Sequence, residues 1–384
     1  MDTIYLDHNA TTPIRPEVAD VVDLAYRRFY ANPASQHRPG QDARRALDDA
    51  REQFAALLGA SLSGPRADRI TFTSGGTEAN NLAVFGISAG GDAGPGHLVI
   101  SAIEHASVVE PAEVLLENGW RLDCLGVTPD GVMRTDELPR LLQEPTQLVS
   151  AILANHETGV LQPVADLAIL CNQRGIPLHT DTAQAAGKLP IDFRGLGVAA
   201  MSIAAHKFQG PLGVGALILR HDTPLAPLFF GGNQEGGRRP GTVCVALVLG
   251  MVKALELCQS EQTAHATRLT AQRQRFEARL AAGFPGLVVN GAAAPRLPNT
   301  SSIAFPGLDA QVLLMALDMA GVACSVGSAC SSGSTELSPT LRAMGVPREV
   351  LVSSLRFSLG NTTTEAEIDE AVARILHVCS RLRP

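Results

Sequence analysis

The sequence has few aromatic residues, few charged residues and no hydrophobic run long enough to cross a membrane. Of its 384 residues, 4% are aromatic and 18% are charged, whereas 45% are hydrophobic. The longest apolar stretches, such as 243–252, are much shorter than the ~20 residues of a membrane span. The start, MDTIYLDH, lacks the pattern of a signal peptide. We therefore expect a globular, cytoplasmic protein without a membrane partner.

Strongly basic segments are also absent. The formal net charge is −7, and the densest basic stretches (44–45, 238–239 and 268–279) are short and mixed with acidic or apolar residues. Nucleic acids are bound through clustered basic side chains. The charge pattern therefore predicts no direct contact with nucleic acid.

Paired cysteine motifs are missing as well. Seven cysteines are scattered along the chain without a CxxC motif, at positions 124, 171, 244, 258, 324, 330 and 379. This pattern argues against a disulfide framework and against a metal site. Cys330 differs from the others because it lies in SVGSACSSGS, residues 325–334, where small residues flank it on both sides.

Short apolar runs alternate with helical patterns over the middle of the chain, which is typical of an α/β fold. The expected strands are 70–73, 97–101, 148–154, 177–180, 199–203 and 215–219. Because these runs are almost continuously apolar, we expect a mostly parallel sheet that is covered on both faces. This sheet would form a large domain.

From about residue 258 the pattern changes and predicts a second, smaller α+β domain. Asp309 is the expected N-cap of one of its helices, and residues 362–364 precede the last helix. The expected elements are a helix over 264–282, strands over 287–289, 301–305 and 355–359, a helix over 310–320 and a final helix after residue 364.

Polar residues follow the expected strands, where ligands bind in parallel sheets. The first group is SGGT, residues 74–77, with Gly76 and Thr77 at the start of a helix. The backbone amides of such a turn could bind a phosphate. The alternative is a glycine turn that serves only chain geometry.

Two polar side chains follow the strand over 177–180. Asp181 could keep a heterocyclic nitrogen protonated, as an Asp does in pyridoxal-phosphate (PLP) enzymes, and Gln184 could donate to an oxygen on the same ring. The alternatives are an Asp that makes a local turn and a solvated Gln.

Three further residues complete the candidate site. Lys207 follows an apolar strand and is suited to Schiff-base chemistry. His105 could stack on a ring or act as an acid or base. Arg356 lies on the polar side of its strand and could bind a substrate carboxylate. Each has a structural alternative: a lysine stem on apolar surface, a structural histidine and a surface ion pair. Together these groups indicate a PLP enzyme that acts on an amino acid.

Nine blocks of the sequence, in order from about residue 4 to 372, resemble the cysteine desulfurases of the NifS/IscS type, in the class V aminotransferase superfamily. The blocks are YLDHNATTP, FTSGGTEANNLA, IEHASV, NHETGVLQP, HTDTAQAAGKLPID, AHKFQGPLGVGAL, GGNQEGGRRPGT, SVGSACSSGS and LRFSLGNTTTEAEID.

The resemblance implies a fold-type I homodimer that binds pyridoxal 5'-phosphate. Each chain would have a large seven-stranded domain over 16–257 and a small domain formed by 1–15 and 258–384, which carries a mobile Cys330 loop. The substrate would be L-cysteine, and a sulfur-acceptor or scaffold protein would be a further partner.

The resemblance also assigns roles to individual residues. Lys207 would form the Schiff base, His105 would stack on the ring and move protons, and Cys330 would be the nucleophile. Asp181 and Gln184 would contact the ring. The phosphate would be bound by Gly76, Thr77 and His206, and the phosphate in the other subunit would be contacted by Thr242. The substrate carboxylate would be bound by Asn155 and Arg356.

The implied reaction converts L-cysteine to L-alanine and leaves a persulfide on Cys330. Selenocysteine lyase or cysteine sulfinate desulfinase activity remains an alternative, as does a sulfur- or iron-binding scaffold with vestigial PLP chemistry. The destination of the sulfur is open between iron–sulfur clusters, thiolated tRNA, molybdenum cofactor and DNA phosphorothioation. The chain departs from the family at Ala204, where relatives carry a phosphate-binding serine, so we expect weaker retention of PLP.

Overall fold

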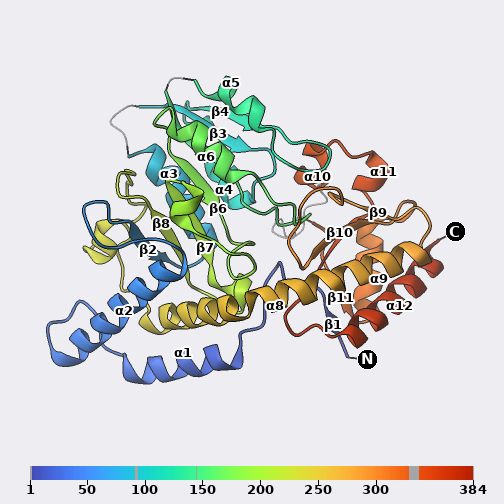
Figure 1. Ribbon diagram of the computed structural model, residues 1–384, viewed down its shortest axis with the longest axis horizontal. Helices are drawn as coiled ribbons and strands as arrows, with labels where there is room; N and C mark the ends of the chain where they lie inside the picture. Colours follow the sequence, from blue (N-terminus) through green and yellow to red (C-terminus); the bar gives the residue numbers. More distant parts are fainter. Residues whose placement is uncertain (1, 91–93, 144, 328–336, 384) are drawn as a thin grey trace.

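The computed structural model describes residues 2–90, 94–143, 145–327 and 337–383. Its largest element is a seven-stranded sheet with the order β2-β8-β7-β6-β5-β3-β4 (Figure 1). The strands are β2 (Arg69–Thr73), β3 (His97–Ser101), β4 (Arg121–Leu125), β5 (Thr146–Ser150), β6 (Leu178–Asp181), β7 (Ala200–Ala204) and β8 (Gly215–Leu219). Only β8 runs antiparallel to its neighbours, which confirms the prediction of a mostly parallel sheet.

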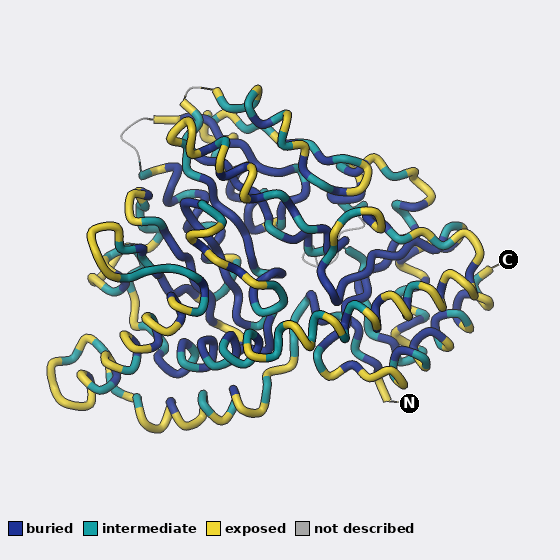
Figure 2. Tube along the Cα trace, viewed as in Figure 1, coloured by how far each residue is buried: buried dark blue, intermediate teal, exposed yellow. Residues whose placement is uncertain are grey.

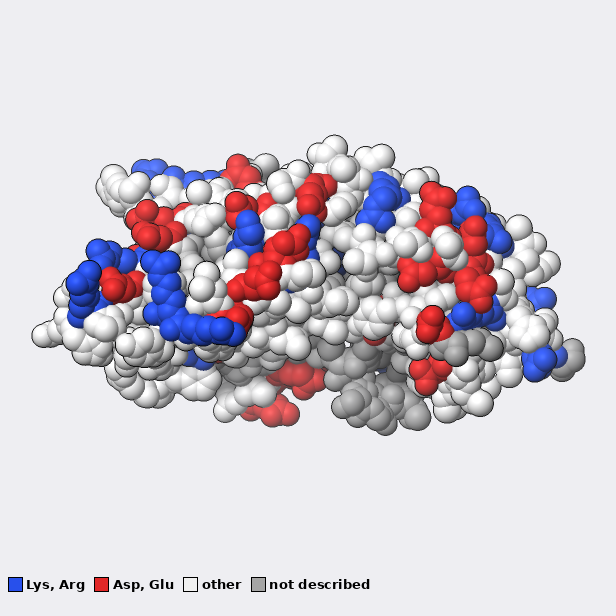
Figure 3. Space-filling model, turned by 90° about the horizontal axis from the view of Figure 1, so that it is seen from below, with Lys and Arg blue, Asp and Glu red and all other residues white. Residues whose placement is uncertain are grey.

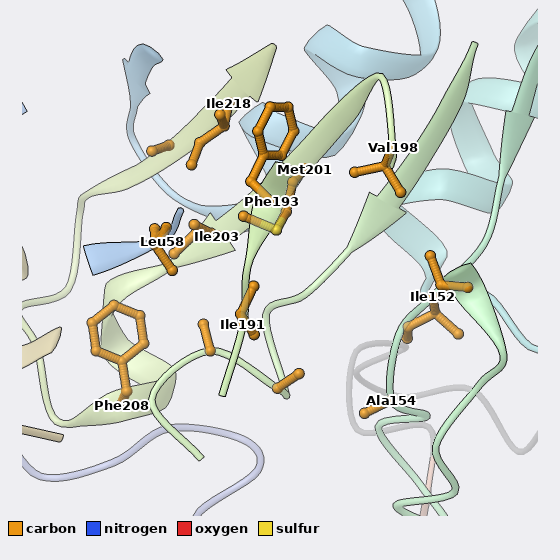
Figure 4. Close-up of a cluster of buried hydrophobic side chains, with 14 of the residues drawn as sticks. Leu58, Ile152, Ala154, Ile191, Phe193, Val198, Met201, Ile203, Phe208 and Ile218 are labelled. Carbon is orange, nitrogen blue, oxygen red and sulfur yellow. The ribbon is translucent and has the colours of Figure 1, made fainter. Parts of the chain in front are cut away.

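Helices cover both faces of this sheet. On one face, α3 (Gly76–Ser88) and α4 (Ala106–Glu117) pack on Leu98, Leu148 and Leu217 of the strands. On the other face, α2 (Arg38–Leu57), α6 (Val164–Asn172) and α8 (Val245–Gly283) belong to a larger apolar cluster. Figure 4 shows part of that cluster around Met201 and Ile203 of β7.

The remaining helices connect or flank these layers. The helix α1 (Pro16–Arg28) packs along α8. Four short helices are α5 (Leu138–Leu141), α7 (Phe193–Leu196), α10 (Pro339–Ala343) and α11 (Arg348–Leu351). Tight helical turns are formed by Thr135–Glu137, Ala205–Phe208 and Gln234–Gly237.

The N-terminal strand lies beside elements of the C-terminal third of the chain (Figure 1), and a second apolar cluster joins them. Its elements are β1 (Ile4–Tyr5), β9 (Val288–Val289), β10 (Thr300–Ala304), β11 (Val322–Ala323), β12 (Ser354–Ser358), α9 (Ala310–Met319) and α12 (Glu365–Leu382). As predicted, Asp309 caps α9 by accepting from the amides of Gln311 and Val312. Thr364 and Glu367 form a capping box at the start of α12.

In the large sheet and in α8, three elements differ from the sequence prediction. The edge strand β4 was not expected because most of its residues are not buried, so it lacks an apolar run. β5 ends at Ser150, before the expected residue 154. The helix expected over 264–282 begins at Val245. Its first half was not predicted because it is apolar on several sides and shows no clear helical periodicity.

The long helix α8 contributes to both apolar clusters. Cys258 lies in the cluster under the sheet and Leu269 in the second cluster, so the expected boundary near residue 258 falls inside one continuous helix. Leu341 and Met344, from the part expected to be the small domain, also pack in the cluster under the sheet. The division into 16–257 and 1–15 with 258–384 stays a prediction.

Burial follows this layered arrangement. The strands of the sheet are mostly buried, whereas α1 and the segment that follows it are largely exposed (Figure 2). Acidic and basic side chains are interspersed on the face shown in Figure 3. No helix among the described residues is both long enough and apolar enough to cross a membrane.

Candidate active site

A cavity of about 210 Å³ lies at the edge of the sheet where β2, β3, β5, β6 and β7 end. Most of the predicted site residues line it. Its lining residues are Ala10, Gly76, Thr77, Asn80, His105, Ser107, Ile152, His156, Asp181, Ala183, Gln184, Ala204, His206 and Lys207. The parallel strands therefore bring together side chains that are far apart in the sequence.

The start of α3 forms one wall of the cavity. Gly76 and Thr77 are its first residues, so their backbone amides have no partner within the helix and can bind an anion. A Cβ atom on Gly76 would lie 3.1 Å from Cβ of Ala204, a tight contact that would require Ala204 to shift slightly. Ala204 presents a methyl group at this wall and supplies no hydrogen-bond donor.

Asp181 is the last residue of β6 and is 4% exposed. Its Oδ2 accepts a hydrogen bond of 2.8 Å from Nδ2 of Asn80, and its Oδ1 accepts one of 2.8 Å from the amide of Ala183. These bonds hold the carboxylate at the cavity wall, where it can pair with a protonated ring nitrogen.

Lys207 lies in the helical turn that follows β7. Its Nζ donates to the carbonyl oxygens of Asn9 at 2.6 Å and Ala10 at 2.9 Å. The same oxygen of Asn9 accepts a 2.9 Å bond from Nε2 of Gln184. The N-terminal segment thus holds two of the predicted site residues, a role that the sequence analysis did not assign to it.

His105 is the N-cap of α4 and lies beside a second histidine. Its Nδ1 is 2.7 Å from Oγ of Ser107, and its ring meets that of His156 edge to face at 5.2 Å. Burial lowers the pKa of His156 well below its usual value, and the nearby charges of His105 and Arg356 act in the same direction. His156 is therefore neutral, and its buried Nδ1 has no hydrogen-bond partner among the described residues.

His206 also lines the cavity and is neutral near pH 7. Burial and the charges of Lys207 and Lys188 lower its pKa to about 4. Its Nδ1 is 3.1 Å from Oγ1 of Thr11. A neutral imidazole can donate one hydrogen bond to a phosphate without adding a positive charge to the site.

Three predicted residues do not line the cavity. Asn155 is fully buried, and its Oδ1 accepts from the amides of Glu157 and Thr158. Arg356 is 3% exposed and donates to Oδ1 of Asp7 at 2.8 Å and to the carbonyl of His156 at 3.1 Å. Thr242 lies beside a separate hollow.

Asn155 and Arg356 lie next to the cavity, because both contact the loop that carries His156. Their predicted contact with a substrate carboxylate remains a prediction, as does the predicted contact of Thr242 across a dimer.

Cys330 lies outside the described residues. Cys324 is described, and burial raises the pKa of its thiol to about 12, so this cysteine stays protonated and is a poor nucleophile at neutral pH. Among the described residues, no three His, Cys, Asp or Glu side chains are placed to bind a metal ion together.

The sequence profile described as Aminotransferase class-V matches residues 4–371. The chain belongs to this family. Within the family it is similar to cysteine desulfurases: "Cysteine desulfurase IscS" of Dictyoglomus turgidum is 38% identical over 99% of this chain and 95% of that protein. The prediction of a PLP-dependent cysteine desulfurase is thereby confirmed.

The fold is also similar to solved structures of this family. A structure described as a NIFS-like protein has a TM-score of 0.91 and 32% identity, covering 99% of this chain and all of the other. One described as "SspA in complex with cysteine" has a TM-score of 0.80 and 28% identity, covering 94% of this chain and all of the other. The fold-type I prediction is confirmed.

The described residues fit the cofactor of this family. They supply a carboxylate for a ring nitrogen at Asp181, an amine at Lys207 and an anion-binding helix start at Thr77. His156 also lines this cavity, and its buried Nδ1 has no hydrogen-bond partner in the part of the chain that the structure describes. PLP, when bound, withdraws electrons from the α-carbon of an amino acid.

Four residues at the site were not predicted from the sequence: Asn9, Asn80, His156 and Lys188. Nζ of Lys188 donates to Oε1 of Gln184 at 2.9 Å and to Oδ1 of Asn9 at 3.1 Å. A sequence signal existed for two of them, because His156 directly follows Asn155 and Lys188 lies four residues after Gln184.

Proposed function

We propose that Cys330 takes the sulfur of L-cysteine and keeps it as a persulfide until an acceptor protein removes it. In this step the Cys330 thiolate attacks the sulfur of the substrate. A sulfur–sulfur bond forms and the Cβ–sulfur bond breaks. Its electron pair stays with the carbon skeleton, which is protonated and leaves as L-alanine. L-Cysteine and one protein thiol thus become L-alanine and one protein persulfide.

The observation that carries this proposal is the arrangement of Lys207, Asp181 and His105 around one cavity in a chain of the cysteine desulfurase family. Lys207 would bind the cofactor and move the α-proton of the substrate. Asp181 would hold the ring nitrogen protonated, and His105 would lie against the ring and transfer protons. Gly76, Thr77 and His206 would bind the phosphate.

Further assignments belong to this proposal. Gln184 would contact the ring hydroxyl, and Asn155 and Arg356 would bind the substrate carboxylate. The protein would be a homodimer, in which Thr242 of the partner subunit reaches the phosphate. It would work in the cytoplasm and pass its sulfur to an acceptor or scaffold protein.

The proposal is tested with the cofactor-loaded protein and L-cysteine as substrate. The wild-type protein should absorb visible light as a lysine-bound PLP, and should form L-alanine. Lys207→Ala should lose the visible band and at least ~10³-fold of the activity. Full alanine production by Lys207→Ala would disprove the assigned chemistry. A wild-type protein that prefers selenocysteine or cysteine sulfinate over L-cysteine would disprove the assigned substrate.

A further inference from the structure

Glu157 is a buried carboxylate in the loop that follows β5, and it is 1% exposed. Its Oε2 accepts a hydrogen bond of 2.6 Å from Oγ of Ser338, the N-cap of α10. Thr340 of the same helix also donates to the carboxylate. Glu157 therefore holds the chain just after residues 328–336.

The same carboxylate lies against the chain just before those residues. A Cβ atom on Gly327 would come within 2.0 Å of Oε2 and 2.7 Å of Cδ of Glu157. The backbone of Gly327 is outside the left-handed region, so the need for glycine there is one of space. Ser325, two residues earlier, is paired with Arg356 of β12 through backbone bonds of 2.6 and 3.1 Å.

Glu157 is thus in contact with both ends of the segment that contains Cys330. Its neighbour His156 lines the cavity and packs on His105. The carbonyl of His156 accepts from Arg356, whose charge also acts on Glu157. A single short loop, residues 155–157, therefore joins the cavity to the two ends of the cysteine segment.

We propose that Glu157 is a positioning residue for sulfur transfer: its carboxylate fixes the two ends of the Cys330 segment relative to the cavity. This inference rests on the proposed role of Cys330. A carboxylate that bonds to Ser338 and Thr340 on one side and touches Gly327 on the other keeps these ends at a fixed separation. Loss of that restraint should slow the step that uses Cys330 and leave the chemistry at the α-carbon intact.

The test uses the cofactor-loaded Glu157→Gln variant and two measurements. The first is the rate at which the α-proton of L-alanine exchanges in deuterated water, which requires Lys207 but no Cys330. The second is the rate of persulfide formation on Cys330 with L-cysteine, followed by alkylation and mass spectrometry. We expect exchange within about twofold of wild type. Persulfide formation should be slowed about tenfold or more, because the amide lacks the negative charge and one of the two acceptor oxygens of the carboxylate.

The matched control is Glu277→Gln. Glu277 also accepts a 2.6 Å bond from a serine, Ser301, but it belongs to the region of the second apolar cluster. We expect both rates to stay within about twofold of wild type in this variant. If Glu277→Gln slowed persulfide formation to the same extent, the effect would not be specific to Glu157, and the proposal would be overturned.

Gly327→Ala provides an independent variant that keeps the carboxylate. Its new methyl group should push Glu157 away from Ser338, so we expect the same selective loss of persulfide formation. The proposal is overturned if Glu157→Gln leaves both rates unchanged, or if it slows exchange and persulfide formation equally. A wild-type protein that forms no persulfide on Cys330 would instead disprove the proposed function.

Discussion

Nζ of Lys188 lies 2.9 Å from Oε1 of Gln184 and 3.1 Å from Oδ1 of Asn9. Gln184 in turn donates to the carbonyl of Asn9, which also accepts from Lys207. Burial, with the charges of Lys207 and Arg356, lowers the pKa of Lys188 to about 7. A second lysine is therefore part of the hydrogen-bond network that holds Lys207.

Replacement of Lys188 by Met should weaken cofactor retention. The variant removes the bond that orients the Gln184 amide, and a hydrogen bond to a charged group contributes about 1.5–3 kcal/mol. We expect PLP to dissociate about tenfold faster, as followed by loss of the visible band during dilution. Lys253→Met is the control, because Lys253 pairs with Glu256 on the same helix. Equal dissociation rates in Lys188→Met and wild type would contradict this role.

Ala204→Ser should have the opposite effect. The serine hydroxyl would lie beside the start of α3 and restore a phosphate donor that the cavity lacks at this position. We expect PLP to dissociate about tenfold more slowly. Ala205→Ser, one residue along and packed in the apolar cluster, should bring no such gain. If Ala204→Ser retained PLP no better than wild type, another donor would already occupy that role.

His179 should make the protein sensitive to acid. Burial lowers its pKa to about 4, and its nitrogens are 2.9 Å from Oγ of Ser150 and Oγ of Ser202. Between about pH 6.5 and pH 4 the unfolded state binds a proton that the folded state does not. The free energy of unfolding should therefore fall with falling pH, by about 3 kcal/mol from this residue.

Denaturant unfolding at several pH values measures this slope. His179→Gln should reduce the loss of stability between pH 6.5 and pH 4, although the variant starts from a lower stability. His377→Gln, at an exposed position, should leave the slope unchanged. A slope that is the same in His179→Gln and wild type would show that other groups cause the acid sensitivity.

Phe230 should belong to the proposed dimer interface. It is 88% exposed and precedes the glycine-rich segment that leads to Thr242. We expect Phe230→Asp to shift the protein toward monomers in analytical ultracentrifugation and to weaken PLP binding by removing Thr242 from the partner's phosphate. Met319→Asp, at a position that is 90% exposed on α9, should leave the dimer intact. A stable Phe230→Asp dimer would argue against this interface.

Much of the sheet could be predicted from the sequence, because buried parallel strands are short apolar runs. Part of the candidate site could be predicted with it, because its residues follow the ends of these runs. Asp181 and Lys207 were found because each comes at the end of such a run. β4 and the first half of α8 were missed, because the first is a partly exposed edge strand and the second is buried too uniformly to show a period.

Contacts between distant segments could not be predicted in this way. Asn80 reaches Asp181 from the first turns of α3, and Asn9 reaches Lys207 from the N-terminal segment. Arg356 donates to Asp7 and to the carbonyl of His156, two partners that the alternation of its strand did not indicate. Such pairings depend on how the elements pack, and local periodicity carries no information about them.

The central claim is that Cys330 receives sulfur from L-cysteine at the cavity around Lys207. Mass spectrometry of the alkylated protein after one turnover with L-cysteine tests it most directly. The account predicts one added sulfur on Cys330, L-alanine in equal amount, and loss of both in Cys330→Ser but not in Cys324→Ser. Sulfur on another cysteine, or full alanine formation by Cys330→Ser, would contradict it.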